Sequence, residues 1–470
     1  MTNKASRSKD YAPPVFTPYP FFVQVRKKEN GNYCVKTNTH MLDDLMIEQD
    51  IDLNYITLPY CGIDCDIRLD CDDTELHQRI CLNFDNNSAY HIFLQERHPS
   101  FPNAFTNLAH VLNHPTAFHD AKASLNAFNG KPILFLGAGP SLEANFEVVR
   151  AVRELNNITI IAGGSANRVL CKHGIFPHYA LAYDPNQVEK TVVFDHLTDE
   201  YMDNVAFITT LGLYSECFKR IKKGYLVCTG AMEKFYELLL DNPTIVSEGK
   251  SSVTNMITRY SELLGVSDLY FLGVDLMFRE GSLHQYADID TIKNEKTVDY
   301  ELINNEHTGG KDVETRIAWC REAQDIVQDV AKHNYKFHQL SQRSLLSDYW
   351  EFPKEDINQL LSIEGDRGKM VDTLPMFDRR KAMKVMKDLH TEISYLYEET
   401  QRLRSLKKFI KEQQPNSKIL KNIIYSYLIV QDFREIRTSE WDDSLIRTVI
   451  AKFKGYIEGF YEENVRELLN

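Results

Sequence analysis

The sequence predicts an α/β protein in which a central parallel sheet lies between a β-rich N-terminal domain and an α-helical C-terminal domain. Between residue 131 and about residue 340, short apolar strands alternate several times with amphipathic helices, which favours a parallel sheet covered on both faces. Strand-like alternation dominates before this region, and from about Leu345 the periodicity is helical to the end. We therefore expect domains over residues 1–128, 129–345 and 346–470.

Composition restricts the class of protein. The chain has 470 residues, 43% of them apolar, which is enough for more than one domain with a substantial core. Its formal net charge of -13 disfavours binding to nucleic acid or to a membrane surface, because an acidic field repels polyanions. No apolar run approaches the roughly 18 residues of a membrane span, and the first residues are polar. We expect a cytoplasmic protein, in which the nine cysteines are reduced.

The N-terminal region has the pattern of a small β domain and carries no recognisable chemistry. Residues 21–37 predict a β-hairpin with Asn-Gly at its turn, and further strands are expected over residues 55–60, 65–69 and 90–94. The acidic residues between Asp64 and Asp73 lack the loop of a calcium site, and Cys61, Cys65 and Cys71 lack the spacing of a zinc site. We expect helices over residues 104–112 and 117–128 to lead into the centre.

The centre begins with a strand, a glycine turn and a helix over residues 131–154. The apolar run of residues 133–136 predicts a buried strand, and Gly137 and Gly139 open the turn. Pro140 and Ser141 then begin a helix. Backbone N–H groups in such a turn can hold a phosphate, although the same pattern also serves simply to reverse the chain. Under the first interpretation, a bulky residue at position 139 should block phosphate binding, and its cost to the fold should be modest if the position lies at the surface of the turn.

Two sequence motifs are missing from this region, and their absence narrows the class of ligand that the turn could bind. Leu142 occupies the position of the third glycine of a dinucleotide fingerprint, and the next strand, residues 158–162, ends in Gly163-Gly164-Ser165 instead of an acidic residue. Neither glycine is followed by the Lys-Ser/Thr pair of a Walker A motif. These residues therefore favour a nucleotide or sugar-nucleotide site without a dinucleotide cofactor.

Further candidate residues follow other predicted strands. Strands are expected over residues 179–183, 205–210, 225–228, 244–246 and 269–274, and in parallel sheets ligands bind beyond the carboxyl ends of strands. The residues that we place at this edge are Gly164, Ser165, Asn167, Asp184 and Asp275. A run of small polar residues also begins a long helix, where it either caps the helix or binds a ligand; its members are Ser251, Ser252, Thr254 and Asn255.

A histidine follows Asp275 in a predicted loop. His284 stands nine residues after Asp275, and an imidazole that titrates near neutrality suits general-base work on an alcohol.

In the C-terminal region, Met386, Leu389 and Ile393 form one apolar helical stripe, which suits a partner-protein surface or a homo-oligomer contact.

Four of these motifs, in this order, resemble the bacterial Maf (motility accessory factor) flagellin glycosyltransferases. They are Gly137–Leu142, the Gly174–Pro185 block, Ser251–Thr254 and the Gly273–His284 segment. The wider superfamily includes the 6-hydroxymethylpterin diphosphokinases. The chain departs from the family pattern at His178, where an acidic residue is expected, and in residues 337–344, where glycines are expected.

The resemblance implies a Rossmann-like, sialyltransferase-like centre and a specific reaction. A nonulosonic acid of pseudaminic or legionaminic type would pass from its CMP-activated form to Ser or Thr of flagellin. Under this interpretation His284 is the general base, while Asp184 or Asp275 holds a ribose hydroxyl or a divalent ion, with the need for Mg²⁺ or Mn²⁺ left open. Two alternatives stand beside it: an ATP-dependent pterin-type diphosphokinase and a non-catalytic flagellin-binding module.

Overall fold

The computed structural model describes the central part of the chain and several separate segments. The described residues are 22–27, 33–37, 47–51, 66–70, 100–229, 232–241, 243, 245–247, 252–278, 301–303, 313–315, 317–341, 343–348, 352–373, 376–402 and 443–469.

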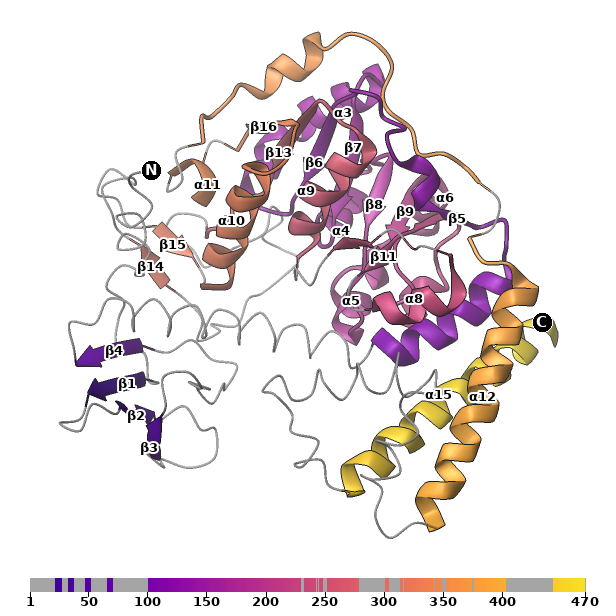
Figure 1. Ribbon diagram of the computed structural model, residues 1–470. Coiled ribbons are helices and arrows are strands. Elements are labelled where there is room, and N and C mark those ends of the chain that lie inside the picture. Colours follow the sequence, from indigo (N-terminus) through magenta and orange to yellow (C-terminus); the bar gives the residue numbers. More distant parts are fainter. Residues whose placement is uncertain are drawn as a thin grey trace.

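The central domain is built on a parallel sheet of eight strands (Figure 1). The strand order is β16-β13-β6-β7-β8-β9-β10-β5, and every neighbouring pair in it is parallel. In chain order the strands are β5 (Phe118–Asp120), β6 (Ile133–Leu136), β7 (Thr159–Gly163), β8 (Tyr179–Leu181), β9 (Ala206–Thr209), β10 (Gly224–Leu226), β13 (Asp268–Leu272) and β16 (Lys336–Gln339). The predicted α/β class with a parallel sheet is confirmed.

Helices connect these strands and cover the sheet. They are a helix over residues 100–113, α3 (Phe146–Leu155), α4 (Ala166–Lys172), α5 (Gln187–Val192), α6 (Asp199–Asn204), α7 (Ser215–Phe218), α8 (Glu233–Leu239), α9 (Val253–Leu264), α10 (Ile317–Val330) and α11 (Leu345–Asp348). None of the described helices is long and apolar enough to cross a lipid bilayer.

Smaller sheets accompany the central one. The predicted hairpin is present as β1 (Phe22–Lys27) and β2 (Tyr33–Thr37), with β3 (Ile47–Ile51) and β4 (Asp66–Asp70) on either side. The expected strands over residues 55–60 and 90–94 lie outside the described residues. The expected strand near Thr244 is β12 (Ile245–Ser247), which pairs with β11 (Cys228–Thr229) apart from the main sheet. A further hairpin joins β14 (Glu301–Ile303) and β15 (Val313–Thr315).

One predicted helix is wrong. Residues 117–128 form the edge strand β5 and a 3-10 turn, η2 (Ala121–Ser124), instead of a helix. Phe118 is fully buried and stacks on Phe218 with ring centroids 4.8 Å apart, while β5 pairs with β10. Such pairing partners lie about a hundred positions away in the sequence, so local periodicity does not reveal them.

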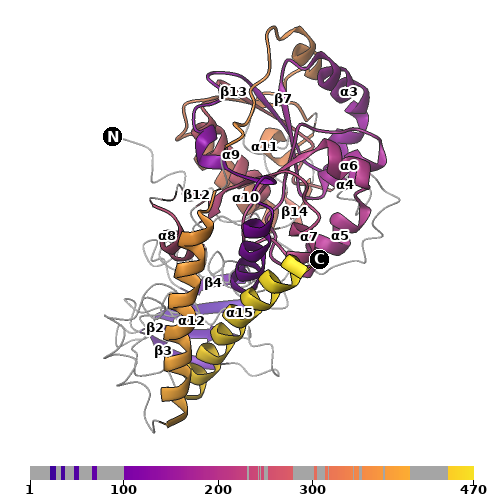
Figure 2. The same cartoon turned by 90° about the vertical axis from the view of Figure 1, so that its right-hand side faces the viewer.

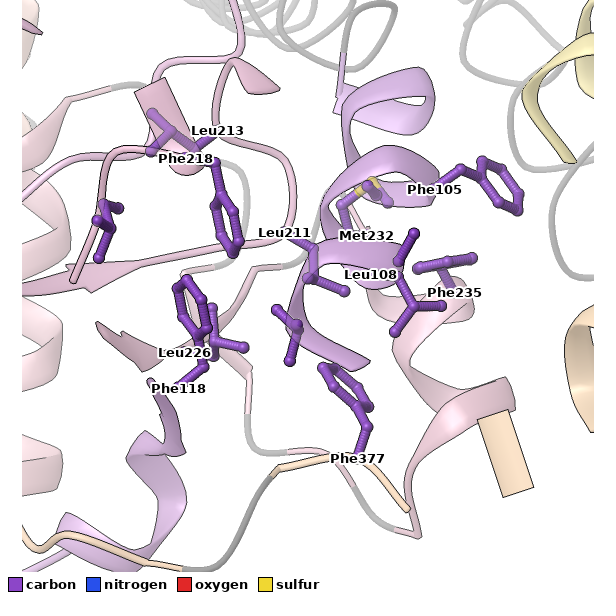
Figure 3. Packing of buried hydrophobic residues seen from close by; sticks show 14 of the residues in the cluster. Phe105, Leu108, Phe118, Leu211, Leu213, Phe218, Leu226, Met232, Phe235 and Phe377 are labelled. Atoms are coloured by element: carbon purple, nitrogen blue, oxygen red, sulfur yellow. The ribbon is translucent and has the colours of Figure 1, made fainter. Parts of the chain in front are cut away.

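The largest hydrophobic core joins the central domain to the C-terminal helices. Figure 3 shows part of it, where side chains from the helix over residues 100–113 meet those of β5, β10 and α8. The same core includes Met386, Leu389 and Ile393 of α12 (Arg379–Arg402) and Phe453 and Phe460 of α15 (Asp443–Leu469). The predicted apolar stripe is therefore buried within the chain itself.

The C-terminal helices α12 and α15 lie side by side and extend away from the sheet (Figures 1 and 2). Helical structure begins at Leu345 with the short α11 but does not continue as the periodicity indicates. Residues 352–373 contain one 3-10 turn, η8 (Ile357–Ser362), and are otherwise extended or irregular. We call residues 363–373 the strap, drawn in orange in Figure 1.

The strap is bound to the amino-terminal edge of the sheet by hydrogen bonds from several strands. Thr159 Oγ1 donates to the Gly368 carbonyl at 2.7 Å, and the Met370 amide donates to the Tyr179 hydroxyl at 2.9 Å. Farther along, the Asp120 amide donates to Thr373 Oγ1 at 3.1 Å. These contacts are between distant parts of the chain, which explains why the helical periodicity of the flanking sequence gives no sign of the strap.

Candidate functional site

The order of the strands defines a switch point between β6 and β13. From β6 the chain adds β7, β8, β9 and β10 on one side, and later places β13 and β16 on the other. In open parallel sheets the loops that leave such a point diverge to opposite faces, and ligands bind in the crevice between them. The Gly137–Ser141 and Gly273–Asp275 loops leave the sheet here, so sequence and topology indicate the same edge.

The two loops are in direct backbone contact. The Gly137 amide donates to the Leu272 carbonyl at 2.8 Å, and the Gly139 amide donates to the Gly273 carbonyl at 2.7 Å. Gly273 has a φ of 74°, a left-handed conformation that favours glycine. A Cβ atom on Gly137 would lie 2.4 Å from the Gly273 carbonyl oxygen, so this approach requires glycine.

The carboxylate of Asp275 occupies the position in which we expected a ligand anion. Asp275 is 4% exposed, and its Oδ2 accepts the Ser141 amide at 2.7 Å. Its Oδ1 accepts the Ser141 hydroxyl at 2.5 Å. Ser341, at the end of β16, also approaches the Ser141 hydroxyl, at 2.8 Å. The amides of Gly137, Gly139 and Ser141 therefore have partners within the chain, and this turn joins the two halves of the sheet.

The helix after the turn begins differently from the prediction. Pro140 is the first residue of a 3-10 helix, η3 (Pro140–Asn145), and α3 follows it directly. The missing N–H of proline has no intrahelical partner at this position in any case, so Pro140 fits the start of η3.

The second glycine turn lies at the end of β7. Gly164 has a φ of 43°, and its amide donates to the Leu181 carbonyl of β8 at 3.1 Å. Asn167 is fully buried, and its Nδ2 donates to the Gly164 carbonyl at 2.9 Å. Its Oδ1 accepts the Tyr201 hydroxyl at 2.9 Å. Asn167 thus fixes the turn, while Ser165 stays half-buried as the first residue before α4.

The start of α9 packs beside this turn. A Cβ atom on Gly163 would lie 3.1 Å from Val253, so α9 begins against the end of β7. Ser252 is the cap of α9, and its Oγ accepts the Asn255 amide at 3.1 Å. Burial raises the pKa of Glu322, while hydrogen bonds from Ser252 and Thr254 act in the opposite direction. These contacts match the capping interpretation of the polar run.

Asn255 has one buried oxygen without a partner. The side chain is 2% exposed, and its Nδ2 donates to Asp325 Oδ2 at 3.4 Å. Within the described part of the chain, Oδ1 of Asn255 accepts no hydrogen bond. Ser251 and His284 lie outside the described residues, as does a second histidine, His307, which precedes Gly309 and Gly310 in the sequence.

Asp184 belongs to a separate group beyond β8. Its Oδ1 accepts the backbone amide and the Nδ2 group of Asn186 at 2.8 and 2.9 Å, so it orders the start of α5. Glu189 on α5 is 8% exposed, and burial together with the nearby Asp184 carboxylate raises its pKa to about 8. The sequence gives no sign that Glu189 is buried, because a lone glutamate in a helix usually faces solvent.

The sequence-predicted residues therefore form three groups. The switch-point group contains Gly137, Gly139, Pro140, Ser141 and Asp275; the β7 group contains Gly164, Ser165, Asn167, Ser252, Thr254 and Asn255; and Asp184 lies with Glu189. All three lie at carboxyl ends of neighbouring or near-neighbouring strands. Among the described residues, no His, Cys, Asp and Glu side chains gather in a group of three that could hold a metal ion.

The condition for a modest cost at Gly139, a position at the open surface of the turn, is not met. A Cβ atom there would lie 2.6 Å from the Gly273 carbonyl oxygen and 2.7 Å from Asp275 Oδ2. We expect Gly139→Val to lower the free energy of unfolding by about 3 kcal/mol, because the two loops must separate. Urea unfolding followed by circular dichroism measures this, and an unchanged midpoint would contradict the packing described.

A glycine in open space provides the matched control. Gly455 in α15 is exposed, and a Cβ atom there would meet no atom within 4 Å. Gly455→Ala should raise the free energy of unfolding by about 0.5–1 kcal/mol, because alanine loses less backbone entropy than glycine in a helix.

A family model and a solved structure are similar to this chain. Residues 102–281 match the family model described as 6-hydroxymethylpterin diphosphokinase MptE-like. A solved structure, the MAf glycosyltransferase from Magnetospirillum magneticum AMB-1, is similar at 12% sequence identity and a TM-score of 0.44. The match covers 86% of this chain and 64% of that one. No curated protein matches the sequence.

Proposed function

We propose that this chain, whose residues 102–281 match the family model described as 6-hydroxymethylpterin diphosphokinase MptE-like, is a glycosyltransferase. In this proposal it moves a nonulosonic acid of pseudaminic or legionaminic type from a CMP-activated donor to Ser or Thr of flagellin. The support for the donor and acceptor is the resemblance of the sequence motifs to those of Maf glycosyltransferases.

One observation carries the proposal. Three motifs behind the resemblance are separated by up to about 140 positions in the sequence, yet each contributes a residue just beyond the carboxyl end of a strand of one parallel sheet. Gly137 follows β6, Asp184 follows β8 and Asp275 follows β13, and between them Gly164 follows β7. This is the edge at which α/β sheets bind nucleotides.

The contacts suggest a division of roles among these residues. Because the Ser141 amide is already bound to Asp275, we assign the switch-point group to holding the two loops in place. The half-buried Ser165 and the start of α9 are then the groups that meet the CMP phosphate, since backbone donors stabilise a leaving phosphate, while Gly164 shapes the turn that holds Ser165. His284 takes the proton from the acceptor hydroxyl. The proposal assigns no step to a divalent ion.

The family-model match favours one competing function, an ATP-dependent pterin-type diphosphokinase. Both reactions break or form a bond at a nucleotide phosphate, so the same edge of the sheet would serve either. The two functions differ in the nucleotide: CMP for the transferase and ATP for the kinase.

Thermal unfolding with each nucleotide separates the two functions. A ligand that binds only the folded state stabilises it by about 2.7 kcal/mol at one hundred times its dissociation constant. We expect CMP to raise the unfolding midpoint by a few degrees and ATP or GTP to leave it nearly unchanged. A rise with ATP and none with CMP would favour the diphosphokinase.

A transfer assay then tests the acceptor. Purified flagellin, incubated with the protein and a CMP-activated nonulosonic acid, should gain the mass of one or more sugar residues in intact-mass spectrometry. CMP binding without any gain in flagellin mass would contradict flagellin as the acceptor. It would still agree with CMP as the nucleotide that the protein binds.

A further inference from the structure

A cavity lies at the opposite edge of the sheet from the candidate site. It has a volume of about 230 Å³ and lies at the amino ends of β8, β9 and β10. Its wall includes Arg153 of α3, Arg367 of the strap and Lys223, which comes just before β10. The nucleotide proposed above would bind beyond the carboxyl ends, so this cavity belongs to a different site.

The two arginines converge on the cavity without a carboxylate between them. Nε of Arg153 donates to the Phe176 carbonyl at 2.7 Å, and Nε of Arg367 donates to Asn156 Oδ1 at 2.8 Å. Within the described part of the chain, no Asp or Glu lies within ion-pair distance of either guanidinium. Burial and the charge of Arg367 lower the pKa of Arg153, which agrees with two cations held close together.

His178 adds no charge of its own to this wall. The side chain is 6% exposed; its Nδ1 accepts the Ile160 amide at 3.0 Å, and its Nε2 donates to Asn156 Oδ1 at 3.0 Å. Burial, followed by the nearby charges of Arg367 and Arg153, lowers the pKa of His178 to about 2. The imidazole is therefore neutral. Its hydrogen bonds join the Ile160 amide to Asn156, the residue that also accepts Nε of Arg367.

The remaining charged groups of the wall leave the arginines uncompensated. Lys223 is bound to Asp372 at 2.7 Å, so each neutralises the other. Asp203 also lines the cavity but is exposed to solvent at the end of α6. In a chain whose formal net charge is -13, this pair of arginines stands out as a local positive region.

We propose that this cavity binds a small organic phosphate, with the phosphate group between Arg153 and Arg367. The planar guanidinium matches phosphate oxygens with two parallel hydrogen bonds, and the Nη groups of Arg153 form no hydrogen bond within the described residues. The volume exceeds that of a phosphate ion alone, which leaves room for an organic part beside Tyr225. A bound phosphate would link α3 to the strap.

The competing explanation is purely structural. Arg153 lies in the last turn of α3, where a cation is stabilised by the helix dipole, and Arg367 holds the strap through Asn156. In that case substituting either arginine would change stability but no anion response. The two explanations therefore differ in a measurable property.

Thermal unfolding with glycerol 3-phosphate at constant ionic strength tests the proposal. We expect millimolar ligand to raise the midpoint of the parent protein more than chloride does, and Arg153→Gln and Arg367→Gln each to weaken binding about 10–100-fold. Arg150→Gln, on the same helix but bound to the His173 carbonyl, should respond like the parent. Equal responses of all four proteins, or no response of the parent, would overturn the proposal.

Two further measurements keep the outcome clear. Arg153→Lys retains the charge but not the planar fork, and isothermal calorimetry on it should show at least a tenfold loss of affinity even if the glutamine variants fold poorly. The response of each variant to CMP should equal that of the parent. Loss of the glycerol phosphate response with the CMP response intact separates this site from the nucleotide site.

Discussion

Glu189→Gln is expected to make the protein more stable than the parent at pH 8.5 and about equally stable at pH 4.5. Glu189 is 8% exposed, and its Oε1 accepts no hydrogen bond within the described residues. Burial, helped by the Asp184 carboxylate, raises its pKa from 4.5 to about 8. The folded state therefore keeps the proton over a pH range in which the unfolded chain has lost it.

The sign of the effect follows from proton linkage. Between pH 4.5 and 8 the folded protein binds one more proton at Glu189 than the unfolded chain, so stability falls as the pH rises. The loss is complete above the folded-state pKa and amounts to at most about 5 kcal/mol for a shift of this size. Glutamine resembles the protonated side chain in shape and does not titrate, so the variant lacks this loss.

Urea unfolding at a series of pH values measures the difference. The gap between Glu189→Gln and the parent should widen from pH 4.5 to pH 8 and then stay constant. Glu200→Gln is the control, because Glu200 is an exposed residue in the first turn of α6 and should leave the curve unchanged. Parallel curves for the parent and Glu189→Gln would show that Glu189 ionises normally. The Cys217 thiol near Glu189 stays protonated throughout, since burial raises its pKa as well.

The sequence predicts the fold well where local signals agree with tertiary structure. Four apolar residues followed by a glycine turn locate β6 to the residue, because a buried central strand is apolar on both faces. The edge strand β5 has only three residues and depends on pairing with β10, so no local pattern identifies it. The strap is likewise held by contacts from distant strands.

In the candidate site, too, local sequence patterns identify some residues and tertiary contacts determine the others. Gly137, Gly139 and Asp275 can be selected from the sequence, since glycine turns and acidic strand ends have recognisable patterns. The Asp275 carboxylate can bind the Ser141 amide because β13 lies beside β6. The strand order, which no local pattern reveals, sets this contact. Glu189 and the Arg153–Arg367 pair were not selected at all, because burial and the approach of distant cations appear only in three dimensions.

His284→Ala is expected to lower the rate of sugar transfer about 10²–10⁴-fold, the range in which general-base catalysis contributes. This prediction rests on the proposed transferase, in which a Ser or Thr hydroxyl must lose its proton as it attacks the sugar. Donor binding should be nearly unchanged, since the base contacts the acceptor. Single-turnover assays with excess enzyme, together with the thermal response to CMP, separate the two properties.

His307→Ala is the matched control, because both histidines stand close to glycines in the sequence, His284 after Gly281 and His307 before Gly309. If His284 is the base, its loss should also remove the limb of the pH–rate profile that reports an imidazole titrating near pH 6–7, whereas His307→Ala should keep that limb. Near-parent transfer by His284→Ala together with a large loss in His307→Ala would move the role to His307. The Asp275 carboxylate accepts both the amide and the hydroxyl of Ser141, so we expect Asp275→Asn to reduce stability more than it alters the pH–rate profile.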